Sequence, residues 1–319
     1  MNKKVVLILF CWGSLMAAMS QKKDDFSQWE DSLIQLHQEI IDEYDAVSCY
    51  QKNEHLLYLL REILEMKNSI NYPFQRLKTI SVLTSKDKKV RFFTWYLIDD
   101  QNRHEHYGYL QMYNPKKERY FVYPLIDKWT KASKPTLLTF TPDKWYGAVY
   151  YQMIEVEGGG KTFYTLLGWN GGDVFTQQKI IEIFSLSAAG SPVFGSPVFK
   201  NYGKTRNMRI IFSYSKTVNL PLHYEKQSYL KKTDKRDRKT NKYIYDTIVE
   251  NMIVFNQLIP MDESLETFPQ FMVPEASLND AFCQQQGKWV YKQNVFAVIN
   301  NVLPPAKPYK PKKRIFYQH

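Results

Sequence analysis

From Leu77 onward, apolar and polar side chains alternate with a period of two, and this pattern constrains the fold more than any other feature. Such alternation places successive side chains on opposite faces of a strand. Turn residues such as Asn114-Pro115 and Gly158-Gly159-Gly160 connect the runs, which predicts hairpins and therefore antiparallel pairing. No helix-length segments alternate with the strands, which argues against a βαβ design. We expect strands at 77–84, 90–99, 105–113, 119–126, 136–140, 147–156, 162–169, 179–186, 208–215, 222–230, 243–248, 252–258 and 288–291.

The composition supports a β-rich fold. Aromatic residues make up 15% of the 319 residues, with 23 Tyr and 19 Phe, while there are only 13 Gly. Aromatic and β-branched side chains pack well on a pleated sheet, and disordered chains contain few of them.

Two helices are expected before the strands. Residues 25–45 carry apolar side chains at spacings of three and four, which gives one apolar face. A second helix is expected over 53–67, with Asn53 as its cap and residues 48–50 as the link. The fold class is therefore mainly β (α+β). We expect a helical hairpin over 21–72 packed on an extended antiparallel β domain over 73–303.

The first twenty residues have the pattern of a secretory signal peptide. Lys3 and Lys4 precede an apolar run from residue 5 to 19, and Ala18-Met19-Ser20 offers a cleavage site before Gln21. The run is shorter than the roughly 20 residues of a membrane anchor, and we expect no transmembrane span after cleavage. The sequence therefore predicts export to the periplasm, the cell envelope or the medium.

Charge and export together narrow the expected partners. Cleavage removes two lysines and no acids, so the formal charge falls from +11 to +9. A basic protein favours anionic partners, and because the protein is expected to be exported, we expect no nucleic acid partner. The candidates are an envelope glycan, an anionic membrane surface or another envelope protein. Residues 231–240 read as a solvated hairpin loop, and the basic, proline-rich tail at 304–319 reads as a disordered tail or a docking arm.

Cys49 and Cys283 remain after cleavage. In an oxidising compartment such a pair is a candidate disulfide, and the alternative is two buried thiols.

Metal and catalytic motifs are weak. His104 and His106 would share one face of a strand and could bind Zn²⁺ with a third ligand; the alternative is two exposed histidines at a hairpin end. There is no nucleophile elbow and no phosphate loop. Carboxylates such as Asp143, Glu155, Asp173 and Glu182 could form a glycosidase pair, but nothing ranks them. We assign no catalytic residue and expect no cofactor.

Tryptophans offer a route to ligand binding. Trp95, Trp129, Trp145, Trp169 and Trp289 lie in or near the β-region, where an exposed ring could stack on a sugar, and a buried ring would serve the core. Trp169, Asn170 and Asp173 combine a ring, polar groups and two glycines at a strand end. They form the candidate ligand site.

Three segments resemble parts of uncharacterised exported bacterial proteins: residues 164–173, 179–183 and 253–260. The resemblance implies export but brings no activity or site residue with it. We therefore expect a non-enzymatic binding or scaffold protein of the periplasm or envelope. The alternative is a hydrolase acting on glycan or another envelope polymer.

Overall fold

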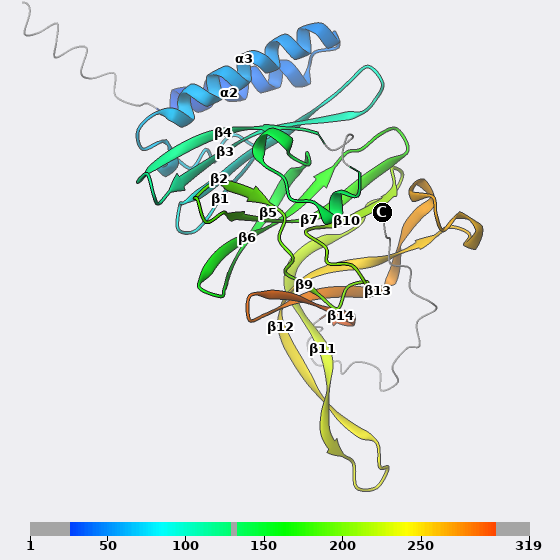
Figure 1. Cartoon of the computed structure of the whole chain (residues 1–319). Coiled ribbons are helices and arrows are strands. Elements are labelled where there is room, and N and C mark those ends of the chain that lie inside the picture. The colour runs from blue at the N-terminus through cyan, green and yellow to red at the C-terminus, as the bar shows by residue number, and fades with distance from the viewer. Residues whose placement is uncertain (1–25, 129–132, 298–319) are drawn as a thin grey trace, which may run out of the picture. The chain divides into compact units, whose positions relative to one another are not determined.

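A computed structural model describes residues 26–128 and 133–297, and the chain divides into two compact units, Met1–Thr79 and Ile80–His319 (Figure 1). The expected signal peptide and the expected basic tail lie outside the described residues. About half of the described residues belong to strands, which pair mainly antiparallel, and two helices precede them, so the expected α+β class with a dominant β content is confirmed.

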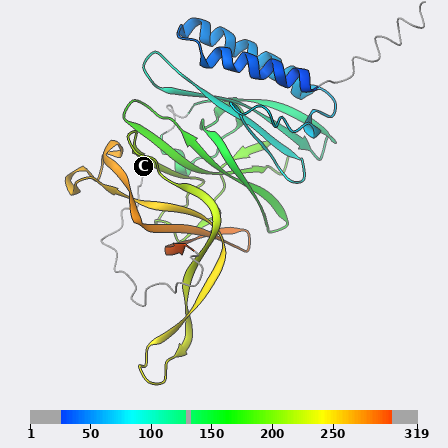
Figure 2. The ribbon, with the colours of Figure 1, turned by 180° about the vertical axis from the view of Figure 1, so that it is seen from behind.

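The N-terminal unit contains the helices α2 (Phe26–Ile41) and α3 (Ala46–Glu65), followed by the 3-10 turn η1 (Ser69–Asn71). The two helices lie side by side in both ribbon views (Figures 1 and 2), and their buried faces include Leu33 and Ile40 of α2 and Leu60 and Ile63 of α3. The expected helical hairpin is confirmed. Among the described residues, no helix is long and apolar enough to cross a bilayer.

The start of α3 differs from the sequence expectation. Asp45 caps the helix by accepting a hydrogen bond from Ser48 N–H at 2.7 Å, so the expected link at 48–50 is helical. Asn53, expected to be the cap, lies inside α3 with 1% of its surface exposed. Asp45 is an equally good cap by residue type, and it leaves a shorter connection between the helices.

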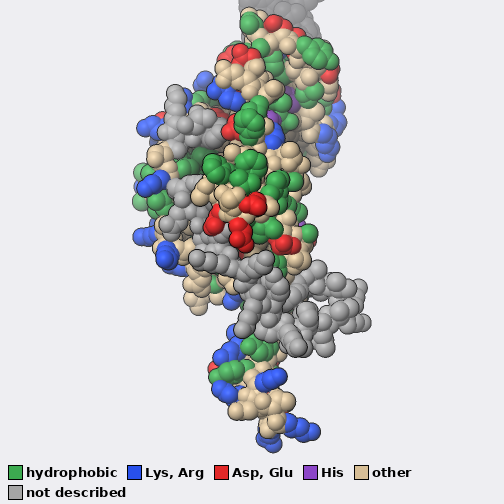
Figure 3. Space-filling view, turned by 90° about the vertical axis from the view of Figure 1, so that its right-hand side faces the viewer, with side chains coloured by type: hydrophobic (Ala, Val, Ile, Leu, Met, Phe, Trp, Pro, Cys, Tyr) green, Lys and Arg blue, Asp and Glu red, His purple; other side chains and the backbone are tan. Residues whose placement is uncertain are grey.

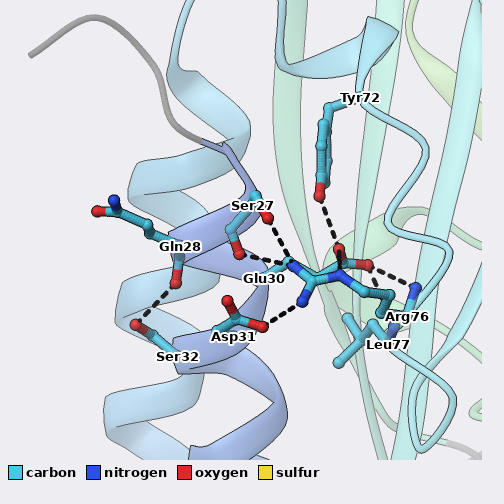
Figure 4. A network of polar contacts seen from close by, with 8 residues as sticks. All are labelled: Ser27, Gln28, Glu30, Asp31, Ser32, Tyr72, Arg76 and Leu77. Carbon is cyan, nitrogen blue, oxygen red and sulfur yellow. Dashed lines mark hydrogen bonds and ion pairs between the residues drawn. The ribbon is translucent and has the colours of Figure 1, made fainter.

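A buried carboxylate fastens the segment after α3 to α2 (Figure 4). Glu30, 1% exposed, accepts hydrogen bonds from Arg76 N–H at 2.8 Å, Arg76 Nε–H at 3.0 Å, Leu77 N–H at 3.2 Å and Tyr72 O–H at 2.7 Å. The Arg76 guanidinium also donates to Asp31 and to Ser27. Four hydrogen-bond donors therefore offset the cost of removing the Glu30 carboxylate from water, as a buried charge requires.

The strands of the described C-terminal unit form three sheets. The first has the order β1 (Ser81–Thr84), β2 (Val90–Ile98), β3 (His104–Asn114), β4 (Arg119–Ile126). The second has the order β10 (Ile210–Ser215), β7 (Thr176–Leu186), β6 (Lys161–Asn170), β5 (Val149–Gly158), and β8 (Pro192–Phe194) pairs with β7. The third has the order β11 (Leu222–Arg236), β12 (Tyr243–Pro260), β13 (Met272–Gln285), β14 (Lys288–Ala297), β9 (Phe199–Lys200). All pair antiparallel except β9, which is parallel to β14.

Two hydrophobic cores lie on opposite faces of the second sheet. Leu166 and Ile180 belong to a core shared with Phe92 of the first sheet. Their neighbours Leu167 and Ile181 belong to a second core, shared with residues of the third sheet. A strand buried on both faces reads as a continuous apolar run, which explains the segment Ile180-Ile181-Glu182-Ile183-Phe184.

Several strand expectations need correction. The expected strand at 136–140 is the 3-10 turn η3 (Pro135–Leu137) with a single bridge from Phe140 to Phe194. The strands expected at 243–248 and 252–258 are one continuous strand, β12. β13 was not expected, because Pro274, Asn279 and Asp280 interrupt its apolar pattern. The expected loop at 231–240 is largely strand, since β11 continues to Arg236. Among the described residues, the remaining 3-10 turns are η4 (Pro142–Lys144), η5 (Glu263–Leu265) and η6 (Pro269–Phe271).

Two hairpin turns of different sheets touch through their backbones. Gly159 and Gly160 form the turn between β5 and β6 with φ of +60° and +71°, which glycine adopts without strain. The preceding Gly158 lies against Gly287 of the β13–β14 turn, where a Cβ built on Gly158 would lie 2.5 Å from the Gly287 Cα. Of the three glycines that the sequence predicts as a turn, Gly158 therefore also makes a backbone contact.

Candidate functional site

The two candidate sites of the sequence meet at one place in the structure. His104 begins β3, and the segment Trp169–Asp173 ends β6 and continues into the loop before β7. His104 N–H donates to Gly172 C=O at 3.0 Å, and Gly171 N–H donates to His106 Nε2 at 3.4 Å. The histidine pair and the Trp169 segment thus belong to one site, where the first sheet meets the second.

Three rings form the centre of this site. The ring centre of Tyr96 lies 5.0 Å from that of His104 and 5.3 Å from that of Trp169. The ring centres of His104 and Trp169 are 5.2 Å apart, with the ring planes at 85°. Trp169 Nε1–H donates to Gln177 Oε1 at 2.8 Å, and Gln177 Nε2–H donates to Val218 C=O at 2.6 Å. These bonds hold the indole in one orientation. We call Tyr96, His104, Trp169 and Lys216 the Trp169 cluster.

Lys216 brings a cation to the rings. Its Nζ lies 3.3 Å from His104 Nδ1 and donates to Gly171 C=O. Burial lowers the pKa of Lys216, while the nearby Asp173 carboxylate opposes that shift. Burial, and then the charge of Lys216, lowers the pKa of His104 to about 4. His104 is therefore neutral at pH 7, accepts from Lys216 at Nδ1 and carries its proton on Nε2.

His106 is fully committed to structural bonds. Its Nδ1–H donates to Asp127 Oδ2 at 2.9 Å, its Nε2 accepts from Gly171, and it is 2% exposed. Asp127 also accepts from the backbone N–H of His106 and of Gly147. Both ring nitrogens of His106 are thus occupied.

The histidine expectations are partly corrected. His104 and His106 do share one buried face of β3. They are 8% and 2% exposed, so the alternative of two exposed histidines is wrong. Nδ1 of His104 bonds to Lys216, and both ring nitrogens of His106 bond to Asp127 and Gly171, so these three nitrogens are already occupied. Within residues 26–128 and 133–297, no group of three or more His, Cys, Asp or Glu side chains is placed to hold a metal ion.

Asn170 and Asp173 shape the loop that carries the site. Asn170 is completely buried; its Nδ2–H donates to Gly147 C=O at 2.6 Å and its Oδ1 accepts from Gly172 N–H at 2.7 Å. A ligand at the surface does not reach this amide, so we assign Asn170 a positioning role in place of direct binding. Asp173 Oδ1 accepts from Phe175 N–H and Thr176 N–H, both at 2.8 Å, and closes the turn.

The accessible part of the site is aromatic and apolar. Tyr96 is 40% exposed, and Trp169 is half-buried. Ile98, directly opposite His104 in the sheet, is 52% exposed, and Phe175, whose C=O accepts from Lys216 N–H, is 68% exposed. Solvent thus reaches parts of both the Tyr96 and Trp169 side chains, and Lys216 beside them is partly exposed.

The other tryptophans do not extend this surface. Trp95, Trp145 and Trp289 are 2% exposed or less and serve the interior, and Trp129 lies outside the described residues. Sequence reasoning found Trp169 but missed Tyr96, Gln177 and Lys216. Tyr96 alternates like any strand residue, and Lys216 lies in a short turn without a motif, so only the folded pairing brings them to Trp169.

The candidate carboxylates each have structural partners. Glu182 is completely buried and accepts from Arg209 Nε–H at 2.7 Å, and Arg209 also donates to Leu138 C=O and Phe194 C=O. Burial raises the pKa of Glu182, and Arg209 opposes that shift. Glu155 accepts from the backbone N–H of Lys86. Asp143 lies in η4, where a hydrogen bond with the Thr141 side chain lowers its pKa. These bonds give each acid a role in the fold.

The two cysteines belong to different units. Cys49 is a partly exposed free thiol of α3, and Cys283 is a buried free thiol of β13. Burial raises the pKa of Cys283 to about 12, and its Sγ lies 3.7 Å from Met252 Sδ. A disulfide between them stays a prediction.

The chain matches no family model, no curated protein and no solved structure.

Proposed function

We propose that this protein is a non-enzymatic binding protein of the periplasm or cell envelope and that the Trp169 cluster contacts its ligand. The observation that carries the proposal is the ring triangle at the end of β2 and β6, with its indole fixed by Gln177. A ring that is held in place and still accessible binds without first losing conformational freedom.

The chemistry of the cluster favours an acidic sugar. Tyr96 and Trp169 offer ring surface for the apolar face of a pyranose, and Lys216 offers a cation for a carboxylate or sulfate group. The lowered pKa of Lys216 reports a partly desolvated ammonium, which an anionic ligand would stabilise. Together these groups support an envelope glycan as the ligand class.

No specific observation favours the alternative of a glycan hydrolase. The carboxylates whose charges act on the cluster, Asp99 and Asp173, already accept hydrogen bonds from the backbone. The hydrolase stays a prediction from the sequence.

Titration with soluble uronic-acid and neutral oligosaccharides, followed by Trp fluorescence and calorimetry, tests the proposal. We expect uronic-acid oligosaccharides to bind. Tyr96→Ala and Lys216→Met should each lower the affinity for these sugars about tenfold or more, as the loss of a central contact does. Tyr58→Ala and Lys204→Met are matched controls, because both side chains are exposed outside the cluster. Failure of every acidic sugar to bind, or equal losses in the controls, would contradict the proposal.

A further inference from the structure

The hairpin of β11 and β12 continues well beyond the sheet to which it belongs. β14 pairs with β11 at Gln227 and Ser228, and β13 pairs with β12 from Met252 onward. Past these points the described chain is a two-stranded ribbon that ends in the turn at 237–242, and both ribbon views show it projecting (Figures 1 and 2). The eight residues of β11 after Ser228 span about 25 Å at the usual rise of a strand. We call residues 229–249 the ribbon.

The ribbon is strongly basic at its end. Residues 231–246 contain seven lysines and arginines against three aspartates. Figure 3 shows blue basic side chains around the lower end of the view, where the ribbon lies, with green hydrophobic side chains among them. Asp237 accepts from Thr240 N–H at 2.7 Å and Lys239 N–H at 3.1 Å, so the turn that carries the outermost cations is held by its own bonds.

One face of the ribbon combines cations with exposed apolar groups. The register places Lys232 opposite Tyr245 and Leu230 opposite Thr247, and opposite residues of an antiparallel pair share a face. Tyr243, two residues before Tyr245, lies on the same face, with Lys232 Nζ 3.4 Å and Arg236 Cζ 4.2 Å from its ring centre. The apolar residues of this face are 37–50% exposed: Leu230, Tyr243, Tyr245 and Val249.

This combination distinguishes between anionic partners. A soluble polyanion needs cations but gains little from exposed Leu and Val side chains. The interface of a bilayer accommodates both, because tyrosine rings lie at headgroup depth, aliphatic groups enter the acyl boundary and Lys or Arg stems reach back to the phosphates. Each basic residue adds attraction to an anionic leaflet.

We propose that the ribbon docks the protein on an anionic phospholipid surface through the face that carries Leu230, Lys232, Arg236, Tyr243, Tyr245 and Val249. The proposal is independent of the Trp169 cluster, since none of these residues belongs to it. It assigns a role to a segment that the sequence alone presents as a solvated loop.

Vesicle sedimentation tests the proposal with the full chain. One set of vesicles contains equal parts of phosphatidylglycerol and phosphatidylcholine, and the other contains phosphatidylcholine alone. We expect the first set to bind the protein more tightly. Lys232→Gln/Arg236→Gln should weaken that binding roughly 10- to 30-fold, whereas the matched pair Lys204→Gln/Arg206→Gln, exposed residues elsewhere in the same unit, should change it by less than about threefold.

Variants of the two tyrosines distinguish a lipid partner from a soluble polyanion. Tyr243→Ser/Tyr245→Ser should weaken vesicle binding about tenfold and leave binding to dextran sulfate nearly unchanged, because the cations remain. Circular dichroism verifies that each variant is folded, and all variants share the same N-terminal apolar segment. Three results would overturn the proposal: equal vesicle binding with and without phosphatidylglycerol, an equal loss of binding in the Lys204/Arg206 control pair, or vesicle binding that does not change in the tyrosine variant. The last result would identify a polyanion site.

Discussion

At the scale of single residues, the site depends on a contact between a ring and a backbone. A Cβ built on Gly171 would lie 2.1 Å from Cγ of His104, so the imidazole occupies the space that any other residue at 171 would need. The same imidazole contacts Tyr96, Trp169 and Lys216. A change at Gly171 is therefore transmitted to the whole Trp169 cluster.

We expect Gly171→Ala to lower the free energy of unfolding by about 1–3 kcal/mol, the usual cost of overpacking. Urea denaturation measures the loss. In a double-mutant cycle with His104→Ala, the cost of the added methyl group should largely disappear, because the ring that it meets is gone. An unchanged cost in the His104→Ala background would show that the methyl group meets something else.

The lowered pKa of His104 also predicts a pH dependence of stability. Its pKa falls from 6.5 to about 4 on folding, so between these values the unfolded chain binds more protons than the folded one. Stability should therefore rise from about pH 4 to 6.5 and be lost as the pH falls through this window. The contribution of His104 is on the order of 1–3 kcal/mol.

Urea titrations at a series of pH values can isolate this contribution. His104→Gln should reduce the pH dependence, and we expect His37 to account for much of the remainder, because burial lowers its pKa to about 4 as well. His55→Gln, at an exposed position of α3, should leave the pH dependence unchanged. The same slope in wild type and His104→Gln would assign the acid sensitivity to other groups.

At the scale of elements, the N-terminal unit shows how one charge can fix a connection. Glu30 on α2 binds two backbone N–H groups of the segment at 76–77, as well as Tyr72 and the Arg76 side chain (Figure 4). The neighbouring Asp31 contacts the same arginine but is 60% exposed. The two acids thus differ mainly in burial and in the number of donors that depend on them.

Glu30→Ala should destabilise the protein by about 2–4 kcal/mol, because it leaves buried donors unsatisfied. Asp31→Ala should cost less than about 1 kcal/mol, as exposed ion pairs do. Thermal or urea unfolding of the two variants compares them directly. Similar losses for both would show that the ion pair with Arg76, and not the buried backbone bonds, dominates.

The positions of helices and strands could be predicted from the sequence wherever a single local residue pattern indicated the element. The period of three and four found both helices, and alternation found β2, β3 and β4 nearly to their ends. It failed for β13, whose Asp280 is buried against Tyr291 O–H and Gln257 Nε2–H. A buried aspartate with its own donors looks like a loop residue in the sequence. The Trp169 segment was found for its glycines and ring, whereas Lys216 depends on a tertiary contact that no local pattern encodes.

At the scale of the whole molecule, the alternation of Leu166 with Leu167 and of Ile180 with Ile181 makes the second sheet the shared wall of two cores. Trp289 of the third sheet adds a bond across one of them, from Nε1–H to Thr165 Oγ1 at 2.8 Å. The sequence predicted strands but not how they divide into three sheets, because this division depends on which face of each strand packs into which core.

Export is predicted for the chain as a whole and can be measured directly. We expect mass spectrometry of the protein recovered from the periplasm or medium of its host to show Gln21 at the N-terminus, because cleavage after Ser20 fits the small residues before it. Protein recovered only from cell lysate with Met1 intact would refute export.

The contact between Gly158 and Gly287 has a consequence for recognising distant relatives. The two turns belong to different sheets, and each excludes a side chain from the other. Chains that share this architecture should therefore hold glycine at both positions or have altered both turns together. Correlated substitution at this pair would indicate that the same contact between turns is kept even where the surrounding strands have diverged.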